Sequence, residues 1–280
     1  MRMHNRLSLA YSPCPNDTYI FAALTHGLLQ DAPPVDVTLL DIDELNAAAQ
    51  TASFDLIKVS FGAIPYLMNN YRILRAGGAL GRGCGPLLVA RPGKFGSLED
   101  VRNARIAIPG ERTTAYLLLQ LALGLTPATT VVRFDQIVDA VARGRVDAGL
   151  IIHESRFTYA SDDLVQVEDL GAWWERTTGN PIPLGAILVR NGLLDAPRID
   201  RVVRQSLAFA RQHEETIMPY VRKHAFEMSE TVMREHIHLY VNEYSDDISD
   251  VGINAVRDLF ERARNVGLLP KTIPTFVEQR

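Results

Sequence analysis

The chain has 280 residues, enough for roughly two domains. Hydrophobic residues make up 47% of it and charged residues 22%, fractions that belong to a folded globular protein and exclude general disorder. The 29 Lys and Arg residues against 33 Asp and Glu residues give a net charge of −4. No basic stripe interrupts this mixed pattern, so we expect no nucleic-acid partner.

Membrane insertion and export are not expected either. The longest strongly apolar stretch, residues 116–125, is too short to span a bilayer about 30 Å thick. The first 17 residues lack the apolar core and cleavage site of an export signal, so we expect a cytoplasmic protein. Cys14 and Cys84 form neither a disulfide framework nor a metal-ligand spacing, and we expect free thiols.

Short apolar runs alternate with longer amphipathic segments, which is typical of α/β proteins. The pattern predicts strands over residues 6–11, 35–40, 55–60, 86–90, 105–109, 130–134, 147–153 and 181–189. It predicts helices over residues 17–26, 42–51, 61–69, 113–124 and 136–143, and a mostly helical segment from residue 199 onward.

The order of these elements predicts two lobes. A first α/β unit leads through a glycine-rich stretch into a second unit, and the strand at 181–189 then returns to the first. We therefore expect a larger discontinuous lobe of residues 1–86 and 185–280, and a smaller inserted lobe of residues 87–184. This is the layout of the type II periplasmic-binding-protein fold, in which a ligand cleft lies between two α/β lobes. Ligands of open α/β sheets bind at the carboxyl ends of strands, where we expect the functional residues.

The first such strand end carries Ser12, Asn16 and Asp17 in a proline-rich loop before a helix. Asn16 or Asp17 can cap that helix, while a functional interpretation has the rigid loop present Ser12 and Asn16 to the cleft. Cys14 lies in the same loop, but no adjacent His or Asp is there to activate it as a nucleophile.

Two further strand ends carry groups that can bind a carboxylate. Lys58 can pair with an anionic ligand, and Ser60 can donate its hydroxyl hydrogen or cap the following helix. After the glycine turn at residue 110, Thr113 and Thr114 begin an apolar helix whose free N–H groups form an anion site. The segment lacks the phosphate-binding GxxxxGK[ST] pattern.

A fourth strand end carries His153. A neutral imidazole with a pKa near 6.5 is suited to removing a proton at physiological pH, although a hydrogen-bonded structural histidine is equally compatible with this position. We expect its neighbour Glu154 to point to the opposite face of the strand.

The remaining candidates favour structural roles. His236 and His238 are two residues apart on a predicted helix, so their side chains diverge and make a poor metal pair. Trp173 and Trp174 can wall an aromatic ligand, but we favour their packing at the lobe junction. Arg82 can clamp a carboxylate, and a hinge or surface ion pair explains it equally well.

Seven segments together resemble the 1,4-dihydroxy-6-naphthoate synthase family of the futalosine route of menaquinone biosynthesis: SPCPNDTYIFAALTHG, DLIKVSFGA, GGALGRGCGPLLVA, PGERTTAYLLL, AGLIIHESRFTY, DLGAWWE and HLYVNEYS. They occur in the family's order between about residues 12 and 263. The resemblance implies a two-lobed binding-protein-like fold that acts as a carbon–carbon lyase. The family converts cyclic dehypoxanthinyl futalosine to 1,4-dihydroxy-6-naphthoate and releases a small sugar-derived fragment.

The resemblance also implies roles for individual residues. His153 takes the place of the family's proposed general base, and the ligand site comprises Lys58, Val59, Ser60, Thr114 and Ala115, with Ser12 and Asn16 as additional members. The implied substrate is an anionic aromatic carboxylate. Because aromatisation of the product supplies the driving force, we expect no metal and no redox cofactor. We expect a monomer or a homodimer.

Three alternatives compete with this interpretation. A non-enzymatic binding protein for a small carboxylate would use the same fold, but the missing export signal counts against it. Chorismate dehydratase of the same pathway shares the fold but lacks, as we interpret it, the SPCPNDT and IIHESR segments. The effector lobe of a transcription regulator is the least favoured.

Overall fold

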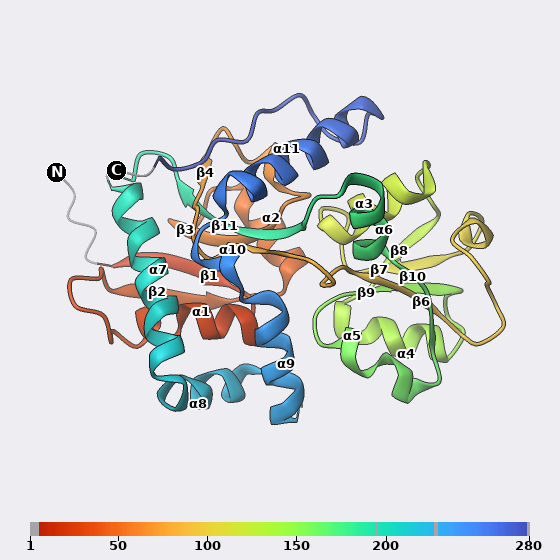
Figure 1. The fold of residues 1–280 in the computed structure, drawn as a ribbon, viewed down its shortest axis with the longest axis horizontal. Coiled ribbons are helices and arrows are strands. Elements are labelled where there is room, and N and C mark those ends of the chain that lie inside the picture. The colour runs from red at the N-terminus through yellow and green to blue at the C-terminus, as the bar shows by residue number, and fades with distance from the viewer. Residues whose placement is uncertain (1–5, 194, 227–228, 279–280) are drawn as a thin grey trace.

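A computed structural model describes residues 6–193, 195–226 and 229–278 of the chain. Its strands form two separate sheets, each covered by helices, so that two α/β lobes lie side by side (Figure 1). The larger sheet contains strands from both the beginning and the middle of the sequence, and the smaller sheet contains only strands that lie between them.

The larger sheet has the strand order β2-β1-β3-β11-β4, and β5 also pairs with β11. β1 pairs in parallel with β2 and β3, whereas β11 runs antiparallel to its three partners. The strands are β1 (Leu7–Tyr11), β2 (Val35–Leu39), β3 (Leu56–Ser60), β4 (Tyr71–Ile73), β5 (Ala79–Gly81) and β11 (Ile182–Arg190). Every residue of β3 is buried, as expected of a central strand covered on both faces.

The smaller sheet has the order β10-β6-β9-β7-β8. β7 pairs in parallel with β8 and β9, while β6 runs antiparallel to β9 and β10. Its strands are β6 (Leu87–Ala90), β7 (Ile106–Ile108), β8 (Thr129–Val131), β9 (Ala148–Ile151) and β10 (Val165–Asp169).

The helices divide between the lobes in the same way (Figure 1). Those of the larger lobe are α1 (Pro15–Thr25), α2 (Ile42–Gln50), α7 (Ala196–Gln212), α8 (Glu214–His224), α9 (Glu230–Tyr240), α10 (Glu243–Asp246) and α11 (Ser249–Asn265). Those of the smaller lobe are α3 (Thr114–Leu123), α4 (Ile137–Ala142), α5 (Ser155–Thr158) and α6 (Leu170–Thr178).

The chain passes between the lobes twice, once between β5 and β6 and once between α6 and β11 (Figure 1). Both passages lie close to the expected boundaries, and β11 begins at Ile182, three residues before the predicted return at residue 185. The division into residues 1–86 with 185–280 and residues 87–184 stays a prediction about domains.

Some sequence-based predictions were wrong in detail. Residues 61–69 do not form a helix but only a short 3₁₀ turn, Ile64–Tyr66. One cause is visible: Pro65 has no N–H to donate to the carbonyl of Phe61, as a helix over these residues requires. The N–H of Phe61, which has no acceptor within a first helical turn, is bonded to the carbonyl of Leu184.

Other elements differ in length or were missed. The strand predicted over 130–134 ends at Val131, and a 3₁₀ turn begins at Phe134. The strand predicted over 147–153 ends at Ile151, because His153 has a positive φ of 56° that an extended strand does not accommodate. β10 and α6 were not predicted at all.

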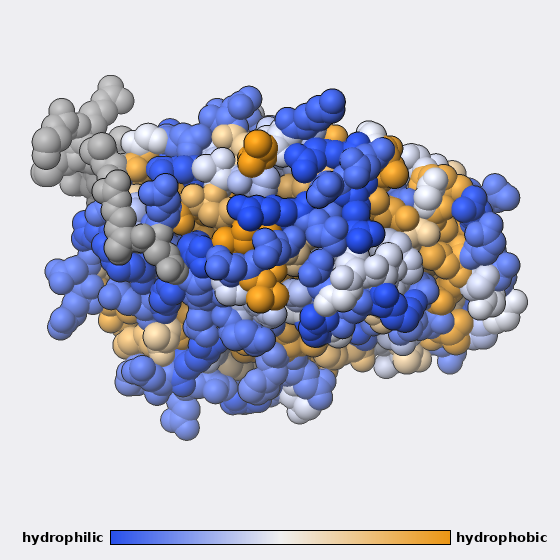
Figure 2. Space-filling model, turned by 45° about the horizontal axis from the view of Figure 1, so that its top comes forward, coloured by the Kyte–Doolittle hydropathy of each residue, from blue (hydrophilic) through white to orange (hydrophobic). Residues whose placement is uncertain are grey.

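The surface shown in Figure 2 is mostly hydrophilic, with hydrophobic residues gathered in several smaller patches. The core residues lie between the sheets and their helices, with Leu9, Ile57 and Leu188 fully buried in the larger lobe. Within the described residues, no helix is long and apolar enough to cross a membrane.

Candidate active site

One buried cavity is lined by side chains and backbone from both lobes. It includes Asp17, Cys84 and Tyr240, which the sequence did not single out as ligand-binding residues. All eight predicted site residues also line it: Ser12, Asn16, Lys58, Val59, Ser60, Thr114, Ala115 and His153. The structure therefore brings together residues that are up to 141 positions apart in the sequence, from Ser12 to His153. Whether each of them binds substrate stays a prediction.

An ion pair lies at the base of the cavity, on the side formed by the larger lobe. Lys58 Nζ donates to Asp17 Oδ1 over 2.8 Å and to the carbonyl of Gly77 over 3.0 Å. The other carboxylate oxygen of Asp17 accepts from the Ser12 hydroxyl over 2.8 Å. The side chains of both charged residues are only 4% exposed. Asp17 is thus no helix cap, and the N-cap position of α1 is held by Cys14.

Lys58 is nevertheless able to contact a ligand. Its ammonium group carries three hydrogens, and the described residues supply acceptors for two of them. Since Lys58 also lines the cavity, the third hydrogen is available to an anionic oxygen there. The predicted pairing with a ligand therefore adds to the internal ion pair and does not replace it.

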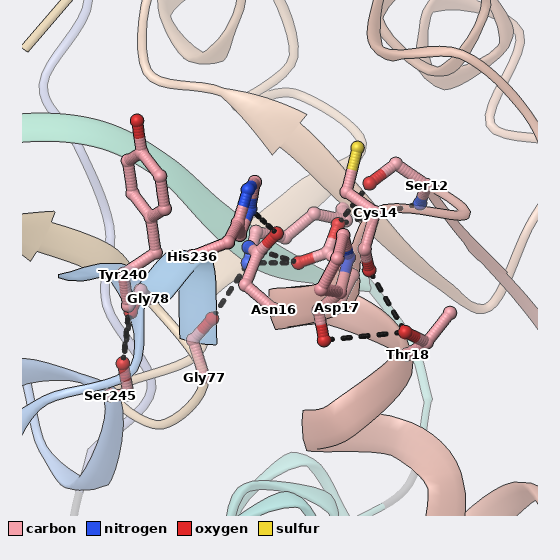
Figure 3. A network of polar contacts seen from close by, with 12 residues as sticks. Ser12, Cys14, Asn16, Asp17, Thr18, Gly77, Gly78, His236, Tyr240 and Ser245 are labelled. Carbon is pink, nitrogen blue, oxygen red and sulfur yellow. Dashed lines mark hydrogen bonds and ion pairs between the residues drawn. The ribbon is translucent and has the colours of Figure 1, made fainter. Parts of the chain in front are cut away.

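Asn16 joins this ion pair to a histidine from the far end of the chain (Figure 3). Its amide nitrogen donates to Asp17 Oδ1 over 3.1 Å, and its Oδ1 lies 3.0 Å from Nε2 of His236 on α9. His236 is fully buried, and burial lowers its pKa well below the usual range. The sequence pattern disfavoured His236 as a metal ligand and gave no indication of this contact with Asn16.

A sequence signal for His236 existed. Met233, His236, Ile237 and Tyr240 follow one another at the three- and four-residue spacing of a helix face, and all four are buried. A histidine on the apolar face of a helix requires a polar partner, and here Asn16 is that partner.

Ser60 is held by a residue of α2. Its hydroxyl accepts a hydrogen bond from Asn46 Nδ2 over 3.1 Å, and its backbone N–H donates to Asn46 Oδ1 over 2.9 Å. Because no α-helix follows directly, Ser60 does not act as a helix cap. Its hydroxyl hydrogen has no acceptor among the described residues and is free to donate into the cavity.

The N-terminus of α3 supplies backbone donors from the smaller lobe. The side chain of Thr113 caps the helix by accepting from the N–H of Tyr116 over 3.2 Å. The Thr114 hydroxyl donates to the carbonyl of Leu184 over 2.7 Å and accepts from the N–H of Gly62 over 3.1 Å. Thr114 therefore offers the cavity its backbone N–H, which belongs to the first turn of α3 and has no partner within the helix.

His153 lies in the loop directly after β9. Burial is the main cause that lowers its pKa to about 4, the charge of Lys58 lowers it further, and that of Asp17 acts in the opposite direction. Its Nε2 atom is buried and has no hydrogen-bond partner in the described part of the chain. The ring of Phe134 contacts it edge-on, with the centroids 5.1 Å apart. His153 is thus a neutral imidazole with a nitrogen free to accept a proton.

Glu154 does not follow the strand alternation on which its predicted orientation depended, because β9 ends at Ile151. Its side chain is buried, and Oε2 has no hydrogen-bond partner among the described residues. Burial raises the pKa of this carboxyl to about 7.

The other candidates have mainly structural contacts. Burial raises the thiol pKa of both Cys14 and Cys84, so neither is an activated thiolate. Trp174 is fully buried, and its Nε1 donates to the carbonyl of Pro181 over 3.1 Å. Arg82 donates to the carbonyl of Gly179 over 2.8 Å and lies 3.7 Å from Glu175, in a largely exposed ion pair. Within the described ranges, no three His, Cys, Asp or Glu side chains gather as a metal site requires.

The cavity thus places hydrogen-bond donors and one free imidazole nitrogen around the same space. Lys58, Ser60 and the first turn of α3 have hydrogens without a protein acceptor in the described residues, and His153 has a buried Nε2 atom without a partner there. Such an arrangement can hold anionic oxygens while it removes a proton from the bound molecule.

The two lobes and the cavity between them define a fold like that of the periplasmic binding proteins. The alkanesulfonate-binding protein of Xanthomonas axonopodis pv. citri has a TM-score of 0.73 at 17% identity, with 98% of each chain covered. A Candida albicans protein described as having the generic periplasmic binding protein fold has a TM-score of 0.67 at 14% identity, covering 98% of each chain. The predicted fold class is confirmed.

More similar proteins identify the family. A protein from Archaeoglobus fulgidus has a TM-score of 0.88 at 33% identity, covering 96% of this chain and 100% of its own. The 1,4-dihydroxy-6-naphthoate synthase of Thermus thermophilus is 49% identical over 277 residues, covering 97% of this chain and 99% of the relative. The synthase of Streptomyces coelicolor is 46% identical over 276 residues, or 96% of each chain. The model of the family described as menaquinone biosynthesis matches residues 7–265, and the chain belongs to this family.

Proposed function

We propose that this chain is a carbon–carbon lyase that converts cyclic dehypoxanthinyl futalosine to 1,4-dihydroxy-6-naphthoate, with His153 as the general base. Its place in the menaquinone biosynthesis family and the names of its relatives support the reaction. The observation that carries the role of His153 is its buried Nε2 atom, which lines the cavity without a hydrogen-bond partner among the described residues.

The donors in the cavity match the chemistry of an anionic aromatic carboxylate. Lys58 has one ammonium hydrogen left, Ser60 has its hydroxyl hydrogen, and the first turn of α3 adds the N–H groups of Thr114 and Ala115. Hydrogen bonds from charged or preorganised donors to an anion are strong where water is excluded. In this proposal, some of these donors bind the substrate carboxylate, and the others bind the ring oxygen that gains negative charge during the reaction.

In the proposed reaction, His153 Nε2 takes a proton from a hydroxyl group of the substrate. The carbon–carbon bond next to this hydroxyl then breaks in retro-aldol fashion, and the sugar-derived fragment leaves as a carbonyl compound. The bonding electron pair moves into the ring system, which is protonated and aromatises to the product. Protons and electrons balance within the substrate and His153, so the step consumes no oxidant or reductant.

The size of the cavity supports a closing movement of the lobes. It measures about 80 Å³, whereas sites for small organic molecules usually begin at roughly 300 Å³. We infer that the lobes move apart to admit substrate and close around it, which excludes water from the base and the donors.

The test is to incubate the purified protein with cyclic dehypoxanthinyl futalosine, without added metal or nucleotide, and to follow the products by chromatography coupled to mass spectrometry. Formation of 1,4-dihydroxy-6-naphthoate supports the proposal. Tight binding of a substrate that is returned unchanged would instead indicate a binding protein. With neither binding nor turnover, the proposal is wrong, and chorismate becomes the next substrate to test. Size-exclusion chromatography with light scattering decides between monomer and homodimer.

A further inference from the structure

A chain of buried polar side chains leads from β3 to α9 beside the cavity (Figure 3). Lys58 Nζ and Asn16 Nδ2 both donate to Asp17 Oδ1, over 2.8 and 3.1 Å. The other end of the Asn16 amide, Oδ1, lies 3.0 Å from His236 Nε2. All four residues are at most 6% exposed, and the proposed reaction assigns no task to His236.

Hydrogen-bond chemistry permits one arrangement of the protons along this chain. The Asp17 carboxylate, paired with an ammonium group, only accepts, so the amide atom of Asn16 that faces it must be the nitrogen. Asn16 therefore turns its oxygen towards His236, and Nε2 of His236 must carry a hydrogen. Because burial lowers the pKa of His236 well below its usual range and its Nδ1 faces no acceptor among the described residues, the ring is the neutral Nε2–H tautomer.

This arrangement leaves a buried acceptor unsatisfied. Nδ1 of His236 has no hydrogen-bond partner among the described residues, and an unpaired buried acceptor lowers stability. The neighbours of the ring are other rings: the centroid of Tyr240 is 4.7 Å away, that of His153 is 6.2 Å away in a stacked arrangement, and that of Phe157 is 6.3 Å away. A leucine would suit such surroundings without an unpaired Nδ1, so stability alone does not account for a histidine here.

Asn16 lines the cavity, so the orientation of its amide group decides which atom it presents there. Its Nδ2 has two hydrogens, and Asp17 accepts one of them. If the amide turned over, a carbonyl oxygen would face Asp17 Oδ1, and the second N–H would be lost as a donor. Asp17 already disfavours this flip, and His236 reinforces the same orientation by supplying a hydrogen that only the Asn16 oxygen accepts.

We propose that His236 is a positioning residue that fixes the Asn16 amide, so that Asn16 and Lys58 together donate hydrogen bonds to one anionic oxygen of the substrate. This inference rests on the proposed function for the identity of the substrate. The tautomer of His236 is a property of the protein alone and does not depend on the proposed function.

The first experiment measures the tautomer directly in the whole protein. Ring-¹⁵N-labelled histidine is incorporated, and two-bond ¹H–¹⁵N correlation spectra are recorded from about pH 6 to about pH 8, where ordinary histidines titrate. The His236 signals are assigned by their loss in His236→Gln. We expect the neutral Nε2–H form throughout this range. An Nδ1–H tautomer, or an imidazolium in this range, would overturn the inference whether or not the substrate assignment is correct.

The second experiment uses variants that separate positioning from structure. Glutamine places its amide nitrogen near the position of Nε2, so His236→Gln retains a donor to Asn16, whereas His236→Leu retains only the volume. We expect kcat to fall about 10- to 100-fold in His236→Leu with a much smaller change in KM, as for loss of one charge-linked hydrogen bond in the transition state. His236→Gln restores most of this loss. His238→Leu, at an exposed position two residues along α9, is the matched control and retains full activity.

A double-variant cycle gives the decisive comparison. If His236 acts through Asn16, His236→Leu has almost no further effect on kcat in an Asn16→Ala background. Additive losses, or equal losses in His236→Gln and His236→Leu, would contradict the inference and leave His236 with a purely structural role. A wild-type protein that forms no product would refute the proposed function, while the tautomer measurement would still decide the state of His236.

Discussion

The ammonium nitrogen of Lys58 lies 2.8 Å from Oδ1 of Asp17, in a place where both side chains are 4% exposed. Taking either charge out of water is expensive, and each charge here is compensated mainly by the other. The pair also has further hydrogen bonds, to the carbonyl of Gly77 and from the hydroxyl of Ser12. This hydrogen-bonded ion pair therefore lies at the base of the cavity and fixes the position of the Lys58 ammonium group, which can donate one hydrogen bond into the cavity.

Removing Lys58 is expected to destabilise the protein strongly. Lys58→Met leaves Asp17 buried without its counter-charge, and we expect a loss of about 3–5 kcal/mol in the free energy of unfolding, measured by urea denaturation. The double variant Lys58→Met/Asp17→Asn should regain most of the stability but no activity, because the donor is still missing. As a control, Lys94→Met in the more exposed Lys94–Asp147 pair should cost at most about 1 kcal/mol. Equal costs for the two lysines would contradict this prediction.

The pH dependence of catalysis should reflect the burial of His153. The imidazole must be neutral to act as a base, and burial lowers its pKa to about 4. Activity should therefore persist as the pH falls through 6.5 and disappear only as it falls through about 4. The measurement is kcat/KM against pH, with circular dichroism as the check that the protein stays folded. A loss of activity centred at pH 6.5 would contradict this prediction. A loss centred near pH 7 that is absent in Glu154→Gln would assign the titration to the Glu154 carboxyl.

The close contact between the lobes at Gly62 is expected to be necessary for activity. A Cβ atom there would lie 2.8 Å from the carbonyl oxygen of Thr113, a backbone atom that cannot move aside alone. Gly62→Ala should hold the lobes apart and lower kcat/KM by about 100-fold, as misplacements near 1 Å commonly do. Gly78→Ala is the matched control, since its nearest neighbours would be 3.7 and 3.8 Å away. Similar activities in the two variants would refute a need for close apposition.

The Thr114 hydroxyl links the same two surfaces through a pair of hydrogen bonds. Thr114→Val keeps the shape but leaves the N–H of Gly62 unpaired, while the carbonyl of Leu184 keeps its hydrogen bond from the N–H of Phe61. We expect a loss of roughly 1–3 kcal/mol in stability from one unsatisfied buried N–H group. Thr130→Val, at an exposed position on β8, should change stability by less than about 0.5 kcal/mol. Urea denaturation of both variants tests this, and an unchanged midpoint for Thr114→Val would show that water replaces the lost partner.

The sequence predicted the fold well where patterns were strong. β1, β2 and β3 are short apolar runs, and α2 begins with a capping box formed by Asp41 and Glu44, so each was found within one residue of its bounds. The helix expected over residues 61–69 failed at Pro65, which cannot donate a helical hydrogen bond to the carbonyl of Phe61. The N–H groups of Phe61 and Gly62 also tie the segment to Leu184 and Thr114, partners that no window around residue 61 contains.

The candidate site was also predictable only in part from the sequence. Strand ends and a helix N-terminus pointed to six of the cavity residues, because the fold places those ends together: Ser12, Asn16, Lys58, Ser60, Thr114 and His153. Val59 and Ala115 were expected only from the family resemblance. His236 was missed because its partner, Asn16, is 220 residues away. For Asp17 the sequence suggested only that it or Asn16 can cap the helix, since only the folded chain brings Lys58 next to it.

The most direct measurement is product formation by His153→Ala beside wild-type protein, with His238→Ala as the control for loss of an exposed histidine. Each protein is mixed in excess with cyclic dehypoxanthinyl futalosine, and 1,4-dihydroxy-6-naphthoate is quantified by mass spectrometry over a single turnover. We expect wild type and His238→Ala to form product at equal rates, and His153→Ala to be slower by about 100-fold or more while folding normally. A normally folded His153→Ala protein that forms product at the wild-type rate would show that His153 is not the base.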